Sequence, residues 1–340
     1  RCGGCGSKVG AQVLSTALRK VRHMMVRRSE VLTGLGDDAA LVLPPAPPAY
    51  LVHSIDYFRS FINDPYVMGQ IAVNHALSDV YAMNAEAVSA MALCVLPYGP
   101  ERMVEDELVQ MLAGALHMLS AANCSLVGGH TSEGAEAALG FSVTGVVHPS
   151  QTLNKGPLPR DSAVILTKPL GTGTILAADM RAQAKGGWVA GAIQSMLLPN
   201  RSAAAILHQH GSTACTDVTG FGLLGHLIEM IQYEGAEDGA GAEEIAVELS
   251  LGDIPALLGA VECVESGILS SLQPQNMRCA RAVANVQFGT GKPIYPLLFD
   301  PQTSGGLLAT VPAGQAEEAV AALRAGGYPS SCVIGRVLPR

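Results

Sequence analysis

Residues 216–226 read Thr216-Asp217-Val218-Thr219-Gly220-Phe221-Gly222-Leu223-Leu224-Gly225-His226. This stretch places an aspartate before a glycine-rich loop, and the loop opens a helix that runs to about Tyr233. Residues 33–43 repeat the theme, because a glycine turn there carries Asp37 and Asp38 ahead of a strand. Each half of the chain interleaves strands with helices and holds an aspartate at such a junction. We therefore predict two α/β lobes that face a shared cleft.

The bulk composition indicates a globular intracellular protein. The 340 residues suit one large domain or two ordinary ones, and a chain that is 49% hydrophobic and 15% charged can bury a sizeable core. A net charge of −8 without a basic run argues against nucleic acid as a main partner. No signal-peptide pattern or membrane-spanning apolar stretch occurs, and the eight cysteines are mostly scattered. We expect a cytoplasmic protein without a membrane partner.

Apolar periodicity predicts the elements of both halves. In the first half, helices are expected at 13–25, 66–83 and 104–121, and strands at 39–43, 50–55, 88–96, 125–127 and 139–147. A proline-containing linker follows at 149–160. In the second half, strands are expected at 163–167, after Gly306 and at 332–337. Helices are expected at 174–181, 188–196, 202–210 and 315–324, in addition to the one that follows residues 216–226 and runs to about residue 233.

The first ten residues hold two thiols among glycines. Lys8 follows Cys5 by three positions, and Cys2 lies just upstream. A thiol beside a fixed ammonium group is favoured as the thiolate, which is the nucleophilic form. From these residues alone, three interpretations stay open: a reactive loop, a frayed terminus, or half of a zinc site.

Five aspartates stand next to apolar residues or glycine: Asp37, Asp38, Asp56, Asp79 and Asp217. Since an unpartnered buried carboxylate is costly, shared cations are the simplest explanation of the set. Carboxylates without His or Cys at ligand spacing favour Mg²⁺ over zinc, and Mg²⁺ usually arrives with substrate phosphates. For any single acid, a helix N-cap or a turn is an equal alternative.

Glycine pairs mark three further junctions, at 34/36, 128/129 and 220/222. Backbone N–H groups at such places can hold phosphate oxygens, although tight turns need glycine without any ligand. Neither a Walker motif nor a dinucleotide fingerprint is present, so a nucleotide site would be of another kind. His130 follows a glycine pair and is a candidate site residue, whereas His75 is interpreted as a core residue.

Together these stretches resemble the selenophosphate synthetase family, in order and over nearly the whole chain. The matching stretches are Cys5-Gly6-Ser7-Lys8, Asp37-Asp38-Ala39-Ala40, Asp56, Asn74-x-x-x-Ser78-Asp79-Val80-Tyr81-Ala82-Met83, Gly128-Gly129-His130, residues 216–226 and Asp300-Pro301-Gln302-Thr303-Ser304-Gly305-Gly306. The last two are long and hard to obtain by chance, whereas Asp-Asp-Ala-Ala is shared with the wider aminoimidazole ribonucleotide synthetase group. The opening also looks like forms fused behind a flavin-dependent oxidoreductase-like domain, which would make this chain the synthetase part of a fusion.

The resemblance implies a selenide, water dikinase, which converts ATP, selenide and water into selenophosphate, AMP and phosphate. It implies that Cys5 and Lys8 are catalytic and that Asp38, Asp79 and Asp217 bind Mg²⁺. The implied nucleotide contacts are Lys8, Leu35, Gly36, Asp37, Asp56, Asp79, Gly129, His130 and Thr131. Selenide or a selenium-delivery protein is the expected partner, and K⁺ is a candidate second cation.

The implied fold is the two-domain α+β fold of the aminoimidazole ribonucleotide synthetase group. Residues 1–157 would form the ATP- and metal-binding domain, with a glycine-rich catalytic loop at 1–10, and would pair with a second copy to build a dimer β-barrel. Residues 158–340 would form a C-terminal α/β domain. Two other functions stay open. A related small-molecule kinase or synthetase would yield ADP and not need Cys5, and a zinc-binding module would use Cys2 and Cys5 without a second close cysteine pair.

Overall fold

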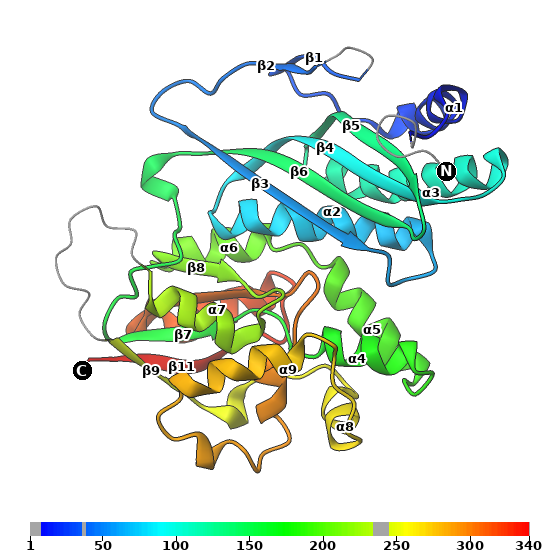
Figure 1. The fold of residues 1–340 in the computed structure, drawn as a ribbon. Helices are drawn as coiled ribbons and strands as arrows, with labels where there is room; N and C mark the ends of the chain where they lie inside the picture. Colours follow the sequence, from blue (N-terminus) through cyan, green and yellow to red (C-terminus); the bar gives the residue numbers. More distant parts are fainter. Residues whose placement is uncertain (1–7, 36–38, 234–244, 340) are drawn as a thin grey trace. The chain divides into compact units, whose positions relative to one another are not determined.

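The structure is a computed structural model that describes residues 8–35, 39–233 and 245–339. The chain divides into two compact units. Unit 1 comprises Arg1–Tyr81 and Ala85–Ser150, and unit 2 comprises Ala82–Asn84 and Gln151–Arg340. Both units contain helices and sheet, as the α+β prediction requires (Figure 1). The functional division into residues 1–157 and 158–340 stays a prediction.

Unit 1 is built on a four-stranded sheet. Its helices are α1 (Ala11–Val21), α2 (Pro65–Ala82) and α3 (Glu101–Ala121), with the 3-10 turn η2 (Arg22–Met24). Its strands are β1 (Val31–Thr33), β2 (Leu41–Val42), β3 (Tyr50–Arg59), β4 (Glu86–Pro97), β5 (Ser125–Gly134) and β6 (Ala138–Val147). Strands β1 and β2 form a separate pair, and the other four follow the order β3-β6-β4-β5. Strands β4 and β5 run parallel, whereas β6 is antiparallel to β3 and β4.

Helices α2 and α3 cover one face of this sheet (Figure 1). Two glycines allow the helices to approach each other closely. A Cβ atom on Gly69 would lie 2.1 Å from the carbonyl oxygen of Met111, and one on Gly114 would lie 1.9 Å from that of Tyr66. Any larger residue at either position would push the helices apart, so these glycines fix how α2 lies against α3.

The other face of the sheet exposes large apolar side chains. Side chains alternate along a strand, so β3 turns Ser54, Asp56 and Phe58 toward α2 and the residues between them away. On the open face the exposed fractions are 48% for Leu51, 67% for Ile55, 47% for Tyr57 and 49% for Met91. This face therefore exposes an unusually apolar surface to solvent.

Unit 2 contains a five-stranded sheet in the order β8-β10-β7-β11-β9, and each neighbouring pair is antiparallel. The strands are β7 (Ser162–Leu166), β8 (Ala214–Asp217), β9 (Ile245–Leu249), β10 (Leu307–Pro312) and β11 (Cys332–Pro339). The helices are α4 (Thr172–Met180), α5 (Gly186–Leu197), α6 (Arg201–Gln209), α7 (Gly222–Ile231), α8 (Ala260–Glu265), α9 (Gln273–Asn276) and α10 (Ala316–Ala325). The 3-10 turns are η4 (Leu251–Asp253), η5 (Met277–Ala282), η6 (Val286–Phe288), η7 (Tyr295–Phe299) and η8 (Ala313–Gln315), and η3 (Pro149–Gln151) lies where the two units join.

Five strands differ from the sequence prediction. Strand β5 continues past Val127 to Gly134, because β4 offers a parallel partner along that whole length. Strand β3 continues past Asp56 to Arg59, since β6 runs beside it as far as Ala138. The short strands β1, β8 and β9 were not predicted. Among the helices in the described part of the chain, none has the length and apolar character to cross a membrane.

Candidate functional site

Two of the predicted site aspartates meet in unit 1. Asp56 lies on the α2-facing side of β3, and Asp79 lies on α2, so the packing of the helix on the sheet brings their carboxyl groups close enough to interact electrostatically. The hydroxyl of Ser54, two residues before Asp56, donates a short hydrogen bond to Asp79 Oδ2. We call Asp56 and Asp79 the acid pair.

The acid pair is electrostatically strained. Burial, followed by the nearby charge of Asp79, raises the pKa of Asp56 to about 7. His75 lies one helical turn before Asp79, and its Nε2 is 3.8 Å from Asp56 Oδ2. The ring of Phe58 packs edge-on against His75 with centroids 5.3 Å apart. His75 is buried, as expected of a core residue, yet it borders the acid pair. Two carboxylates this close favour a shared proton or cation.

The predicted residues on β5 are divided between the two faces of the sheet. The register places Asp56, Phe141, Ala92 and Gly129 in one row across the strands. Because strands are about 4.8 Å apart, the backbones of Asp56 and Gly129 are separated by about 14 Å. His130 occupies the next row, so its side chain points to the open face and away from Asp56.

The glycine on β5 is required by close packing. A Cβ atom on Gly129 would lie only 2.2 Å from the carbonyl oxygen of Ala92. Gly128-Gly129 is therefore part of a strand and not of the loop that the sequence suggested. Tight packing explains this glycine without a ligand. Gly129 itself is exposed, on the edge strand of the sheet.

The ends of two described segments flank β5. Lys8 forms an isolated antiparallel bridge with Ser132, directly after Thr131. Gly34, which precedes Leu35, packs on the same strand, since a Cβ atom there would lie 3.7 Å from Val127 Cα. The other predicted residues of these segments, Cys2, Cys5, Gly36, Asp37 and Asp38, lie outside the described residues.

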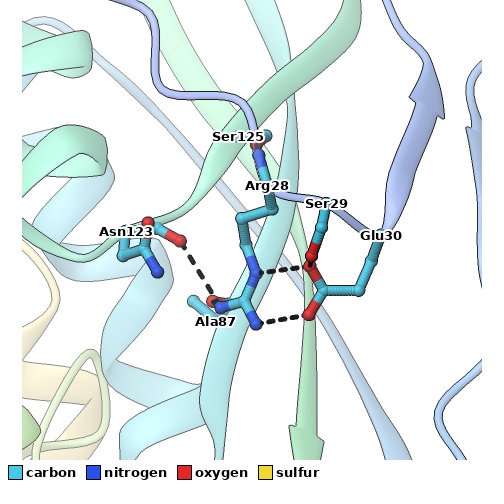
Figure 2. Close-up of polar contacts among 6 residues, drawn as sticks. All are labelled: Arg28, Ser29, Glu30, Ala87, Asn123 and Ser125. Atoms are coloured by element: carbon cyan, nitrogen blue, oxygen red, sulfur yellow. Dashed lines mark hydrogen bonds and ion pairs between the residues drawn. The ribbon is translucent and has the colours of Figure 1, made fainter.

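Arg28, which the sequence analysis did not single out, anchors the segment that leads into β1 (Figure 2). Its guanidinium group donates to the Glu30 carboxylate at 2.7 and 3.3 Å, to the carbonyl of Ala87 at 3.2 Å and to that of Asn123 at 3.5 Å, and its backbone N–H donates to Ser125 Oγ at 2.8 Å. The hydrogen bond with Arg28 lowers the pKa of Glu30 to about 2. These bonds fasten the start of β1 to the starts of β4 and β5.

In unit 2, the predicted ligand Asp217 ends β8 and is 5% exposed. Lys168, which also escaped the sequence analysis, is 1% exposed and follows β7. Its Nζ donates to the carbonyls of Leu198 at 2.5 Å and Ser304 at 3.0 Å. Burial lowers the pKa of Lys168 to about 7, and the negative charge of Asp217 opposes that shift. The buried Lys168 amine therefore interacts electrostatically with Asp217.

The stretch 300–306 forms a buried network that caps α4. Asp300 accepts hydrogen bonds from Thr174 Oγ1 at 2.8 Å and Thr174 N–H at 3.2 Å. Gln302 Oε1 accepts from the N–H groups of Gly171 at 3.0 Å and Thr172 at 3.2 Å, and its Nε2 donates to Asp300 Oδ2 at 2.9 Å. A carboxylate at a helix N-terminus is favourable. Local structure thus accounts for Asp300 without a ligand.

Within the described ranges, no three or more His, Cys, Asp or Glu side chains gather in a way that could hold a metal ion. The acid pair offers two carboxylates, and Mg²⁺ commonly takes one or two of these together with water and substrate phosphate oxygens. The acid pair therefore fits a metal that arrives with its substrate. The predicted convergence of Asp79 with Asp217 joins the two units and stays a prediction.

Comparison with known sequences gives a consistent family. The model of the AIR synthase related protein N-terminal domain matches residues 36–147, and that of the C-terminal domain matches residues 160–340. Selenide, water dikinase of Pelobacter propionicus is 36% identical over 337 residues, which cover 98% of this chain and 93% of that protein. Selenide, water dikinase of Clostridioides difficile is 32% identical over 339 residues, which cover 99% and 94%.

Solved structures are similar in fold over nearly the whole chain. Thiamine-monophosphate kinase from Stenotrophomonas maltophilia has a TM-score of 0.71 at 19% identity, covering 95% of this chain and 94% of that one. The hydrogenase maturation protein HypE in complex with ATP has a TM-score of 0.68 at 18% identity, covering 98% and 88%. The predicted α+β fold is thereby confirmed. By its full-length relatives and its two matching domains, the chain belongs to the selenide, water dikinase family of AIR synthase related proteins.

Proposed function

We propose that this chain synthesises selenophosphate from ATP, selenide and water, and releases AMP and phosphate. One observation carries the proposal: relatives named selenide, water dikinase match 98–99% of the chain at 32–36% identity. A related kinase with another acceptor is not favoured, because thiamine-monophosphate kinase is only 19% identical. The product would supply selenium for selenocysteine or selenouridine.

The acid pair supports Mg²⁺ as the cation of this reaction. A divalent ion would relieve the repulsion between Asp56 and Asp79 and replace the proton that Asp56 otherwise keeps. We assign Asp79 to this ion with Asp38 and Asp217 as further ligands, and Asp56 to the nucleotide or its metals. Bound Mg²⁺ supplies neutralisation of the triphosphate charge during phosphoryl transfer. K⁺ as an additional cation is tested by exchanging it for Na⁺ in the assay.

The amino-terminal segment is the second part of the proposal. The backbone bridge between Lys8 and Ser132 supports a position of Lys8 beside the end of β5. We assign six residues to nucleotide contacts: Gly129, His130 and Thr131 on β5, and Leu35, Gly36 and Asp37. The Cys5 thiolate would meet the selenium substrate, whether selenide or selenium from a delivery protein. The Lys8 ammonium group would stabilise negative charge on thiolate and phosphate.

Product analysis tests the function directly. With ATP, Mg²⁺ and selenide, phosphorus NMR should show selenophosphate, AMP and phosphate in equal amounts, and little AMP should form without selenide. Cys5→Ser should abolish selenophosphate formation, and Lys8→Ala should reduce it strongly. ADP as the final product, or full selenide-dependent activity in both variants, would overturn the assignment.

We also propose a homodimer that covers the open face of the unit 1 sheet over β3, β6 and β4. The exposed apolar side chains of Leu51, Ile55, Tyr57 and Met91 lie on that face, and a second copy would bury them sheet against sheet. Sedimentation should give a dimer for the wild-type protein and a monomer for Ile55→Lys. Met103→Lys, on an α3 residue that is 66% exposed, is the matched control and should stay dimeric. A wild-type monomer at micromolar concentration would refute the dimer.

A cytoplasmic location completes the proposal. The cysteines within the described ranges are free: Cys94, Cys124, Cys215, Cys263, Cys279 and Cys332. Free thiols suit a reducing compartment, as does a reaction that consumes selenide. Fractionation of the source cells, with detection of the protein by antibody, tests this location.

A further inference from the structure

The loop that leaves Asp217 is held by hydrogen bonds along its backbone. We call residues 217–222 the Asp217 loop. Val218 N–H donates to the Gly306 carbonyl at 2.8 Å, Thr219 N–H donates to His226 Nε2 at 3.1 Å, the Thr219 carbonyl accepts from Gly222 N–H at 3.1 Å and Gln302 N–H at 2.9 Å, and the Gly220 carbonyl accepts from Asn276 Nδ2 at 2.8 Å. A loop with its backbone groups bound in this way has one preferred conformation.

The end of the loop is fixed by packing as well. Gly222 has a φ of +72°, and a Cβ atom there would lie 2.9 Å from the carbonyl oxygen of Leu298. Only glycine meets both conditions without strain. Helix α7 therefore starts at a fixed point, and His226 projects from its first turns back toward Thr219.

The hydrogen bond from Thr219 decides the protonation of the His226 ring. A backbone N–H can only donate, so Nε2 must be an unprotonated acceptor, and the neutral ring then carries its proton on Nδ1. Nδ1 lies 3.3 Å from Glu229 Oε2. Glu229 is itself bound by Lys155, with Nζ 2.6 Å from the same oxygen. With Glu229 and Lys155 on its Nδ1 side, the His226 ring turns the Nε2 lone pair toward the loop.

The hydrogen bond to the loop distinguishes His226 from an ordinary apolar residue of the helix core. Helix α7 is otherwise apolar on its buried side, and the His226 ring, in a residue 5% exposed, also meets Phe221 at a centroid distance of 5.5 Å. An apolar side chain could fill the same space, but it would leave the N–H of Thr219 without this acceptor. The peptide held here lies two residues beyond Asp217.

We propose that His226 is a positioning residue that acts through Thr219: its Nδ1-protonated ring, oriented by Glu229 and Lys155, fixes the Asp217 loop and thereby aims the Asp217 carboxylate at the magnesium–nucleotide complex. The inference rests on the proposed function, which makes Asp217 a metal ligand. No other side chain of α7 makes a described hydrogen bond to the loop backbone.

The test measures nucleotide binding independently of turnover. Calorimetry with Mg²⁺ and a non-hydrolysable ATP analogue should show about tenfold weaker binding for His226→Leu, because a buried donor is left unpaired. His226→Gln restores an acceptor oxygen and should stay within about threefold of wild type. The KM for ATP should rise in parallel in His226→Leu, while the KM for selenide stays unchanged. His210→Leu, at the end of α6, is the matched control and should bind as wild type does.

Nitrogen NMR of the imidazole gives a readout that needs neither ligand nor activity. The folded wild-type protein should show His226 with a protonated Nδ1 and an unprotonated Nε2. A protonated Nε2 in the neutral ring overturns the inference, as does normal analogue binding by folded His226→Leu. If His226→Leu does not fold, His226→Gln carries the test, and a tenfold loss of binding in it when folded also overturns the inference.

These measurements distinguish failure of the His226 positioning role from failure of the proposed function. Selenophosphate formation with normal analogue binding by His226→Leu overturns the positioning role alone. Weakened binding in His226→Leu, rescued in His226→Gln, supports the positioning role even if wild type makes no selenophosphate, and then the proposed function alone fails. A wild-type protein that binds no magnesium–nucleotide overturns both.

Discussion

Asp56 in unit 1 and Asp300 in unit 2 share one property and differ in another. Burial is the largest cause of the raised pKa of both, to about 7 for Asp56 and about 6 for Asp300. Donors surround Asp300 and partly offset that rise, whereas the carboxylate of Asp79 raises the pKa of Asp56 further. A carboxylate surrounded by hydrogen-bond donors, such as Asp300, needs no ligand to balance its charge. Two carboxylates this close favour a shared cation or proton, and the proposed function assigns a cation to the acid pair.

The largest expected effect is on activity, at the acid pair. Asp79→Asn should lower selenide-dependent AMP formation by about 10³-fold or more, because the amide cannot neutralise the metal. Asp64→Asn is the control on the same helix. Asp64 caps the start of α2 through the N–H groups of Tyr66 and Val67, and asparagine caps equally well, so activity should stay within about twofold. More than a tenth of wild-type activity in Asp79→Asn would remove the distinction between the two aspartates.

The next effect is on stability, at Asp300. Asp300→Ala should lower the free energy of unfolding by about 3 kcal/mol, measured in urea, because Thr174 and Gln302 lose their buried acceptor. Asp300→Asn keeps one acceptor oxygen and should lose less. Activity per folded molecule should change little in either variant. A folded Asp300→Asn protein of normal stability without activity would place Asp300 among the functional residues.

A smaller effect is expected on the pH dependence of stability, at Asp56. In the metal-free protein, folded Asp56 keeps a proton up to about pH 7, whereas the unfolded chain releases it near the ordinary aspartate pKa of 3.8. The folded state thus binds more protons in this interval, so Asp56 makes stability fall as the pH rises toward 7. Asp56→Asn should therefore melt at a higher temperature than wild type at pH 8 and at a similar one at pH 4. A lower melting temperature at pH 8 would show that the charge is already compensated.

The smallest effect is expected for the exposed ion pair between Arg59, at the end of β3, and Glu136, in the turn between β5 and β6. Arg59 Nη1 lies 3.1 Å from Glu136 Oε2, with side chains 75% and 62% exposed. A double-mutant cycle of Arg59→Ala and Glu136→Ala should give a coupling of about 0.5 kcal/mol or less, since water and salt screen both groups. Coupling well above that value would mean that charge on β3 matters wherever it lies, and not because of the contact between Asp56 and Asp79.

Sequence reasoning predicted the longer helices and most strands, because apolar periodicity is a local property, but it missed the short helices α8 and α9. It identified the fold and placed Asp79 one helical turn after His75. It could not establish that Asp56 faces Asp79, because that contact depends on the register of β3 with β6 and on which face α2 covers. It also could not show that Asp300 is surrounded by donors, because Thr174, which donates to it, lies far from it along the chain.

The residues that sequence reasoning missed carry no periodic signal. Arg28 is one basic residue in a basic stretch, and Lys168 stands between a threonine and a proline. Each has its role from partners far along the chain, such as Ala87 for Arg28 and Ser304 for Lys168. The roles of Cys5, Gly36, Asp37 and Asp38 stay predictions, because these residues lie outside the described ranges.

Under the proposed function, Asp56 and Asp79 share a divalent cation with the nucleotide. Titration with Mn²⁺ in the presence of a non-hydrolysable ATP analogue, with free Mn²⁺ followed by electron paramagnetic resonance, measures this most directly. We predict that Asp79→Asn binds Mn²⁺ at least about tenfold more weakly than wild type, while folded Asp300→Asn binds it normally. Equal Mn²⁺ binding by wild type and Asp79→Asn would contradict the claim.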